Sequence, residues 1–332
     1  MKILITGAAG FMGSNFIKYI LARHADWKII NFDKLTYAGN LANLKEVENN
    51  PNYSFVKGDI ASASDVERVI GDGVDRIINY AAETHVDRSI LAPDAFIKTD
   101  IFGTYTLLEA VRKHNVAQYI QISTDEVFGS IKEGSFNEQS PFEPNSPYAA
   151  SKAGADHLCR AYFKTYNLPI IVTHSCNFFG SNQYPEKLIP LFITNLLENK
   201  KVPVYGAGDQ RREWIYTQDH CAAVETIMEK GESGEVYNIG TGFEKTNLEI
   251  TKFILQELGC GEEMIEYVKD RPGHDWRYAI NSQKLRGLGW QPSVSWEDGL
   301  RRTIKWYKEN ENWWKHIKSG EYLDYYKKQY GK

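Results

Sequence analysis

Two short segments contain residues that could carry out proton chemistry together. Tyr148 and Lys152 are four positions apart, so on a helix both side chains lie on one face. An ammonium group beside a phenol lowers the phenol pKa from its usual value of about 10, and a tyrosinate can then accept the proton of an alcohol. Asp125 and Glu126 follow Thr124 earlier in the chain, and adjacent carboxylates can supply one acid and one base. These residues predict an enzyme that oxidises an alcohol and eliminates water in one pocket.

Each of these two signals has an ordinary explanation when it is taken alone. A Tyr–Lys pair at helical spacing is commonly a surface pair, and two adjacent acidic residues commonly occupy a solvated turn. Both occur here behind a glycine-rich segment that is typical of dinucleotide binding. The combination therefore favours catalysis over either ordinary explanation.

The segments that must position these residues alternate between short apolar runs and amphipathic stretches. Alternating β and α segments predict an α/β fold, a Rossmann-like doubly wound parallel sheet with helices on both faces. Strands are expected at 2–6, 28–32, 54–57, 76–79, 118–123 and 170–174, and helices at 13–24, 64–71, 95–114 and 148–166.

The composition of the chain and the length of its predicted loops change from about residue 177. Loops become longer, and Arg, Trp, Gly and Pro become frequent, which predicts a smaller α/β lobe that holds a polar ligand. We expect a cofactor-binding Rossmann domain with the catalytic residues over 1–176 and a ligand-binding lobe over 177–332. Some strands and helices of the second part are expected to be interleaved with the first.

A glycine-rich turn follows the first predicted strand and opens the first predicted helix. Gly7, Gly10 and Gly13 would let the backbone approach a pyrophosphate at the helix N-terminus, although a tight strand-to-helix turn is the simpler explanation of such spacing alone. Asp33 ends the second strand, where a carboxylate accepts from ribose hydroxyls and repels a 2′-phosphate; this favours NAD over NADP, and the adjacent Lys34 weakens the preference. The further expected cofactor contacts are Phe11, Met12, Lys34, Asp59, Ile60, Ala81 and Ala82, together with Tyr148 and Lys152.

The bulk composition restricts the class of protein. Hydrophobic residues make up 42% and charged residues 25% of the 332 residues, as in soluble globular proteins. A net charge of −4 provides no general attraction to nucleic acid or to an anionic membrane. No apolar run is long enough to span a bilayer, and the four scattered cysteines suit reduced thiols in the cytoplasm. The histidines show no metal-ligand spacing, so no metal is expected.

Seven segments resemble the extended short-chain dehydrogenases/reductases, and more narrowly their nucleotide-sugar 4,6-dehydratases, with the dTDP-glucose branch as the nearest. The resemblance covers nearly the whole chain, and the acidic pair after Thr124 distinguishes these dehydratases from the epimerases that share their fold. The segments are FDKLTYAGN (32–40), AAETHVDRS (81–89), STDEVFG (123–129), SPYAASKAGADH (146–157), PEKLIPL (185–191), RPGHDWRYAI (271–280) and LGW (288–290).

The resemblance implies a reaction sequence. Tyr148, supported by Lys152 and Thr124, would take the proton of the sugar C4 hydroxyl while the C4 hydride moves to NAD. Glu126 would then remove the C5 proton, and Asp125 would protonate the C6 hydroxyl, which leaves as water. Return of the hydride to C6 would give a 4-keto-6-deoxy sugar nucleotide for deoxysugar biosynthesis, with dTDP-glucose as the leading substrate.

The resemblance also assigns substrate-binding residues and an oligomeric state. His85 and Arg88 are expected to face the sugar. Arginines suit the diphosphate because they bind phosphates in a bidentate manner, and relatives pair the helices that match 95–114 and 148–166, which implies a homodimer. The nucleotide is expected to contact Asn177, Lys187, Leu188, Val204, Tyr205, Arg212, Asn247, Arg271 and His274.

Three places depart from the family pattern. Asp100 stands where the family usually has Asn, and it adds a charge near the proton-transfer residues. Residues 177–184 and Trp276 differ in the lobe that should recognise sugar and base, so UDP-glucose and UDP-N-acetylglucosamine are alternative substrates. An NDP-sugar 4-epimerase, which would not use the carboxylates, and a catalytically silent NAD-binding regulator are the alternative classes.

Overall fold

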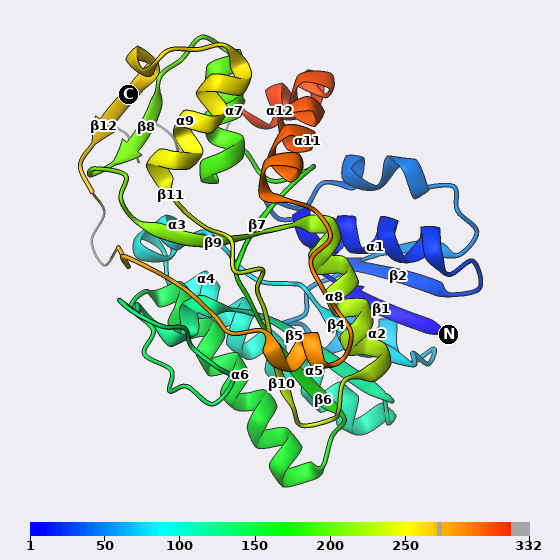
Figure 1. The fold of residues 1–332 in the computed structure, drawn as a ribbon. Coiled ribbons are helices and arrows are strands. Elements are labelled where there is room, and N and C mark those ends of the chain that lie inside the picture. Colours follow the sequence, from blue (N-terminus) through cyan, green and yellow to red (C-terminus); the bar gives the residue numbers. More distant parts are fainter. Residues whose placement is uncertain (271–273, 320–332) are drawn as a thin grey trace.

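The computed structural model describes residues 1–270 and 274–319 and is built around a parallel sheet of seven strands (Figure 1). The strand order is β10-β6-β5-β4-β1-β2-β3, and every neighbouring pair is parallel. The order reverses between β1 and β4, where the carboxyl ends of the strands form the usual ligand crevice of such sheets. The strands are β1 (Lys2–Thr6), β2 (Lys28–Asp33), β3 (Tyr53–Lys57), β4 (Arg76–Asn79), β5 (Gln118–Thr124), β6 (Ile170–Ser175) and β10 (Val236–Ile239).

The predicted fold class is confirmed, and all six predicted strands lie within one residue of the observed bounds. Alternate side chains of the strands enter two separate cores, as parallel strands buried on both faces require. Ile3 and Ile5 of β1 pack with helices α1 and α8, whereas Leu4 packs with α2 and α5. The helices that contribute to these two cores are α1 (Phe11–Arg23) and α8 (Thr217–Lys230) on one face of the sheet, and α2 (Ala63–Ile70), α5 (Gly103–His114) and α6 (Pro147–Tyr166) on the other.

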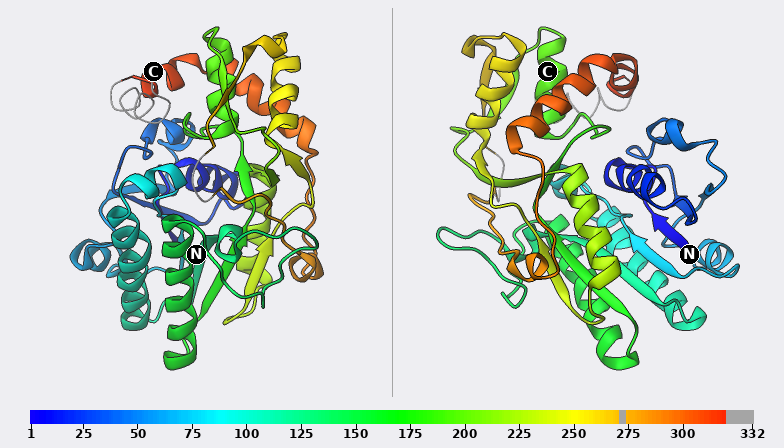
Figure 2. Two further views of the ribbon diagram at one scale, coloured as in Figure 1. Left: turned by 90° about the vertical axis from the view of Figure 1, so that its left-hand side faces the viewer. Right: turned by 45° about the vertical axis from the view of Figure 1, so that its right-hand side comes forward.

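The smaller lobe lies beside the carboxyl ends of the sheet strands (Figures 1 and 2). Its core contains Trp296, Tyr307 and Trp314, so these C-terminal aromatic residues serve internal packing. Its helices are α7 (Leu188–Leu197), α9 (Asn247–Leu258), α11 (Trp296–Glu309) and α12 (Glu311–Ile317). Its strands form the sheets β11-β9-β7 and β12-β8, with β7 (Asn177–Phe179), β8 (Val202–Tyr205), β9 (Arg211–Tyr216), β11 (Glu244–Thr246) and β12 (Ile265–Val268).

Short elements complete the described chain. The expected helix over 95–114 is divided: α4 (Asp94–Phe96) is followed by the π-helical segment η2 (Ile97–Phe102) and then by α5. None of the helices within residues 1–270 and 274–319 is both long and apolar enough to cross a membrane. The remaining elements are η1 (Leu41–Val47), α3 (Val86–Leu91), η3 (Asp125–Phe128), η4 (Glu262–Met264) and α10 (Gln283–Gly287).

Two elements from the second half of the chain belong to the large sheet layer. Strand β10 pairs with β6 in the sheet, and helix α8 packs against α1. We therefore propose a division in which residues 1–176 together with α8 and β10 form the cofactor-binding unit. The rest of 177–332 would form the substrate-binding lobe.

Candidate active site

A cavity of about 790 Å³ lies between the carboxyl ends of the sheet strands and the smaller lobe. It contains every predicted catalytic and cofactor-contacting residue, and all predicted substrate-binding residues except two. Arg88 is not among the lining residues, and Arg271 lies outside the residues that the structure describes. The predicted substrate-binding residues that line it are His85, Asn177, Lys187, Leu188, Val204, Tyr205, Arg212, Asn247 and His274.

The glycine-rich turn between β1 and α1 has no room for side chains. Gly7 has a φ of +62°, and a Cβ atom there would lie 2.5 Å from the Ala81 Cα. A Cβ on Gly13 would lie 2.6 Å from the Ala8 Cα. No side chain of the described residues caps α1 at Gly10, so its first N–H groups can serve an anion. The turn therefore fits a pyrophosphate group.

Asp33 is fixed at the end of β2 by two backbone N–H groups. Its Oδ2 accepts from the Ala9 N–H (2.9 Å) and its Oδ1 from the Leu35 N–H (2.7 Å). Burial raises the pKa of this carboxyl, and the two hydrogen bonds oppose the rise. Lys34 forms an ion pair with Asp59 (Nζ–Oδ2 2.8 Å). This pairing compensates the positive charge of Lys34, which would otherwise weaken the preference for NAD over NADP. The site therefore fits a dinucleotide with a free ribose diol.

Replacing Asp33 with Asn is expected to weaken NAD binding about 10- to 100-fold, because hydrogen bonds to a charged acceptor contribute about 1.5–3 kcal/mol. Discrimination against NADP should also fall, since the repelling charge is lost. Calorimetric titration of protein freed of cofactor measures both effects. Asp72→Asn is the matched control, because Asp72 is exposed and outside the cavity. An unchanged NAD/NADP preference in Asp33→Asn would refute the role of Asp33.

The acidic pair begins a short helix at the end of β5. Thr124 caps η3 by accepting the Glu126 N–H at its Oγ1 (3.3 Å), which turns the chain and places both carboxylates at the strand end. Asp125 is buried, and its Oδ2 has no hydrogen-bond partner among the described residues. Burial above all, then the charges of Glu126 and Glu213, raise its pKa well above the usual range, against Arg212. Burial therefore favours the protonated form of Asp125, which suits this residue to act as an acid.

Tyr148 and Lys152 lie in the first turns of α6, which begins after the Ser146 cap and Pro147. Burial raises the pKa of the Tyr148 phenol well above its usual value, and Glu126 and Asp100 add to the rise. Lys152 Nζ donates to the Ile122 carbonyl (2.7 Å). The prediction that Lys152 lowers the phenol pKa is therefore wrong: burial and the surrounding carboxylates dominate, and a hydrogen bond with Thr124 is what opposes them.

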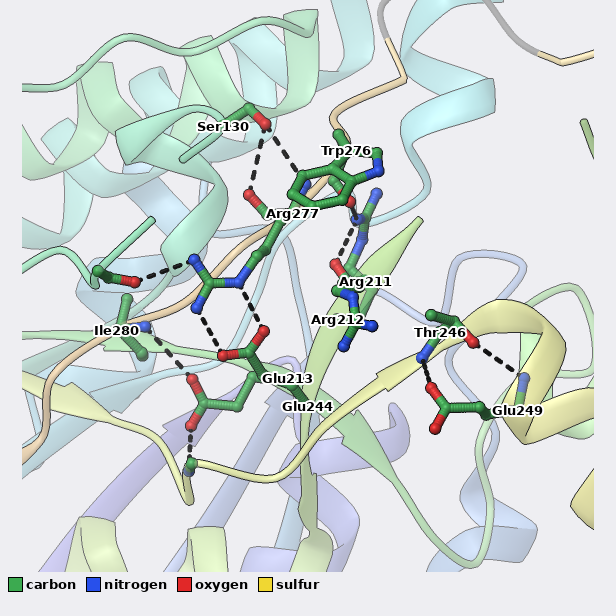
Figure 3. A network of polar contacts seen from close by, with 12 residues as sticks. Ser130, Arg211, Arg212, Glu213, Glu244, Thr246, Glu249, Trp276, Arg277 and Ile280 are labelled. Carbon is green, nitrogen blue, oxygen red and sulfur yellow. Dashed lines mark hydrogen bonds and ion pairs between the residues drawn. The ribbon is translucent and has the colours of Figure 1, made fainter. Parts of the chain in front are cut away.

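Arg212 presents a fixed guanidinium group on the side of the smaller lobe (Figure 3). It donates to the carbonyl oxygens of Arg211 (2.7 Å) and Asp275 (2.9 Å), and it lies 4.2 Å from the ring centroid of Tyr278. The side chain is buried. A guanidinium held in this way keeps a defined direction, as recognition of a diphosphate requires.

A second set of contacts in Figure 3 supports this wall of the cavity. Glu213, next to Arg212, accepts hydrogen bonds from the N–H groups of Gly242 (2.7 Å) and Ile280 (3.3 Å). Arg277 binds both carboxylate oxygens of Glu244 at 2.6 Å. These contacts join β9, β11 and the segment after residue 274, so the position of Arg212 depends on three separate parts of the chain.

Polar contacts cross the cavity between the two lobes. Arg88 pairs with Glu186 (2.9 Å) and lies 3.9 Å from the ring centroid of Tyr37. Lys187 Nζ donates to the Thr84 carbonyl (2.6 Å). Arg88 and Lys187, both predicted to bind substrate, thus hold the lobes together in this structure. Their contacts with a sugar nucleotide stay a prediction.

The departures from the family pattern differ in their relation to the cavity. The side chain of Trp276 is 43% exposed and is not part of the cavity lining. The difference from the family pattern at position 276 therefore gives no reason to prefer a UDP sugar over dTDP-glucose. The segment 177–184 does contribute to the lining, through Asn177, Phe178, Asn182, Gln183 and Tyr184. Any difference in recognition is thus expected from this segment.

Sequence reasoning missed many lining residues of the site, among them Tyr37, Glu186, Tyr278 and Trp313. Tyr37, Glu186 and Tyr278 line the cavity, and all three lie inside the motifs that carried the resemblance. A search of those motifs for further polar side chains could have found them. Trp313 also lines the cavity, and its Nε1 donates to Asn43 Oδ1 (2.9 Å) across the lobes. No local pattern indicated that contact.

Comparisons with known proteins agree with this site. The family model described as GDP-mannose 4,6 dehydratase matches residues 4–303. A dTDP-glucose 4,6-dehydratase of Streptomyces niveus is 47% identical over 324 residues, which cover 96% of each chain. The crystal structure of a dTDP-glucose 4,6-dehydratase from Streptomyces venezuelae, with NAD and TYD bound, has a TM-score of 0.93 and 48% identity, covering 96% of this chain and 100% of the other.

More distant enzymes share the fold without the same degree of likeness. A UDP-glucose 4-epimerase of Thermus thermophilus, in complex with NAD, has a TM-score of 0.87 but only 28% identity, with 93% of this chain and 100% of the other covered. The expected family and the expected cofactor are confirmed by the nearer relatives. This chain belongs to the NAD-dependent nucleotide-sugar 4,6-dehydratases, a group of hydro-lyases within the extended short-chain dehydrogenases/reductases.

Proposed function

We propose that this enzyme converts dTDP-glucose to its 4-keto-6-deoxy derivative. The observation that carries the proposal is the placement of Asp125, whose pKa burial raises, and of Glu126 in the same cavity as Tyr148 and Lys152. Alcohol oxidation and water elimination both need proton transfers, and these four residues supply separate groups for each. The near relatives that are dTDP-glucose 4,6-dehydratases support dTDP-glucose as the substrate.

In the proposed mechanism, the glycine-rich turn and Asp33 would hold NAD, which when bound would supply a two-electron acceptor for the sugar C4 hydride and, once reduced, a hydride donor to C6. Tyr148 accepts the proton of the C4 hydroxyl, and Thr124 donates a hydrogen bond that favours the phenolate. The ketone at C4 acidifies the C5 proton, and Glu126 removes it; a proton returns to C5 from Glu126 when C6 receives the hydride, so the product differs from the substrate by one water. Asp125, whose pKa burial raises, donates a proton to the departing C6 hydroxyl. Arg212 binds the diphosphate and fixes the sugar against these groups.

Product analysis by mass spectrometry tests this proposal. Purified protein is incubated separately with dTDP-glucose, UDP-glucose and UDP-N-acetylglucosamine. Loss of one water from dTDP-glucose, with slower turnover of the UDP sugars, is the expected result. Turnover of a UDP sugar alone would contradict the proposed substrate and assign specificity to the segment 177–184. Isomerisation without water loss would indicate an epimerase. No reaction with any of the three sugars would favour the alternative of a catalytically silent NAD-binding regulator.

We propose a homodimer formed through η2, α5 and α6. Large apolar side chains are exposed on these neighbouring elements, and Phe102 and Tyr105 contact each other with ring centroids 5.6 Å apart. A group of exposed apolar side chains suits a protein interface. The exposed residues are Ile97, Phe102, Tyr105 and Tyr166.

Phe102→Glu is expected to convert the dimer to a monomer at micromolar concentration, because it places a charge within the apolar surface. Light scattering coupled to size-exclusion chromatography measures the mass. Tyr267→Glu is the control, since Tyr267 is also strongly exposed but lies on β12 in the other lobe. A monomeric unmodified protein, or a Phe102→Glu variant that remains dimeric, would refute this interface.

We further propose that the enzyme acts in the cytoplasm. All four cysteines are free thiols, and Cys159, Cys176 and Cys221 are buried. Burial raises the pKa of each of these three thiols, which keeps them protonated and unreactive. Free buried thiols are typical of proteins in reducing compartments. Fractionation of the source cells tests this location.

A further inference from the structure

Asp100 is a buried carboxyl group that the proposed reaction does not use. It lies on η2 and is only 1% exposed. Its Oδ1 accepts a hydrogen bond from the Glu83 N–H (3.0 Å), and its Oδ2 lies 2.6 Å from the Ser151 hydroxyl. Asp100 thus joins the segment that follows β4 to the catalytic helix α6, at the residue beside Lys152.

The contacts of Ser151 restrict the protonation state of Asp100. The Ser151 Oγ also lies 2.8 Å from the Tyr148 carbonyl oxygen, which can only accept. A hydroxyl has one proton, so Ser151 cannot donate both to this carbonyl and to an ionised Asp100. A protonated Asp100 satisfies both contacts: it donates to Ser151, and Ser151 donates to the Tyr148 carbonyl.

Burial of Asp100 also favours the protonated form, against the opposing charge of Lys152. Glu83 faces it from the segment after β4, and Tyr148 and Lys152 face it from α6. Burial raises the Asp100 pKa to about 7, with a contribution from Glu83, while Lys152 and the two hydrogen bonds act in the opposite direction. An ionised Asp100 would in turn raise the pKa of Tyr148 and oppose its deprotonation.

We propose that Asp100 is a positioning residue that acts in its protonated form, holding the first turn of α6 through the chain Asp100–Ser151–Tyr148 carbonyl. Ionisation of Asp100 removes the donor of this chain and places a negative charge beside the proton acceptor of the reaction. The proposal rests on the proposed function for its effect on turnover. Its structural part, a buried protonated carboxyl, does not.

Asp100→Asn tests the effect on turnover. An asparagine amide accepts at its oxygen and donates from its nitrogen, so it reproduces the protonated acid and cannot ionise. We expect the variant to match the unmodified enzyme within about threefold at acidic pH. The unmodified enzyme should lose kcat through an ionisation near neutral pH that the variant lacks. Superimposable pH profiles, or an inactive variant at every pH, would overturn the proposal.

Asp100→Ala separates positioning from packing. Alanine leaves the Glu83 N–H and Ser151 without their partner, so we expect kcat to fall about tenfold with little change in KM. The asparagine variant should restore it. Equal loss in both variants, or a change confined to KM, would contradict a positioning role.

Two measurements made without substrate test whether Asp100 is protonated, whatever reaction the enzyme catalyses. The infrared spectrum of the unmodified protein minus that of Asp100→Asn should contain the C=O stretch of a protonated carboxylic acid at slightly acidic pH. This band should disappear as the pH rises through neutrality. Because the pKa is raised by folding, the stability contributed by the protonated form is lost as pH rises through the folded-state pKa. The melting temperature should therefore fall with pH relative to Asp100→Asn; absence of both signals would refute a protonated Asp100 even if dehydration is observed.

Discussion

Replacing Glu126 with Gln is expected to abolish water elimination while leaving oxidation at C4 in place. Glu126 lies in the first turn of η3 beside Asp125, and its carboxylate is the base assigned to the C5 proton. A glutamine of the same shape cannot accept this proton, so turnover should fall about 10²- to 10⁴-fold. Tyr148 and Lys152 are unchanged, so the 4-keto sugar should form and remain. Rapid mixing with substrate, followed by the absorbance of reduced nicotinamide, should show a signal that rises and does not decay.

Exchange of the C5 hydrogen with deuterated solvent gives a second, independent measure of the same step. The unmodified enzyme should introduce deuterium at C5 of its product, whereas Glu126→Gln should not. Glu133→Gln is the matched control, because Glu133 is exposed on the loop after η3 and outside the cavity. Full dehydration by Glu126→Gln would remove Glu126 from the mechanism, and an epimerase would be unaffected by the substitution.

The secondary structure around the site could be predicted because local patterns determine it. Six apolar runs flanked by turn residues became β1 to β6, and the glycine turn became the start of α1. Strand β10 was not predicted, since its four residues at Val236–Ile239 carry no pattern that differs from a short buried segment of the smaller lobe. Its place beside β6 is fixed by tertiary contacts instead. The π-helical segment η2 was missed for a similar reason, because no side-chain pattern distinguishes it from the α-helix around it.

The electrostatics of the site could not be predicted from residue types and spacing. The Tyr148–Lys152 spacing correctly placed both side chains in the cavity, but it gave the wrong direction for the phenol pKa. That direction depends on burial and on Glu126 and Asp100, which belong to other elements. The pairing of Arg88 with Glu186 likewise depends on how the two lobes meet. Contacts within one element are thus accessible from sequence, and contacts between elements are not.

Replacing Tyr148 with Phe should remove the proton acceptor for the C4 hydroxyl and stop the reaction before the first intermediate. The phenol is 8% exposed, and burial keeps its pKa well above the usual value. The neutral phenol is therefore the resting form, and C4 oxidation should accelerate as pH rises through the alkaline range, most clearly in Asp100→Asn, where no ionisation of Asp100 opposes deprotonation of the phenol. The phenylalanine variant should lose about 10²- to 10⁴-fold in kcat, with little change in KM, because the residues proposed to contact the nucleotide lie on the other lobe. Unlike Glu126→Gln, it should give no transient of reduced nicotinamide.

Tyr267→Phe, a change on an exposed strand, is the control for the loss of one hydroxyl. A Tyr148→Phe variant that still forms the 4-keto sugar at the normal rate would assign C4 deprotonation to another group, and Thr124 would be the first residue to replace next.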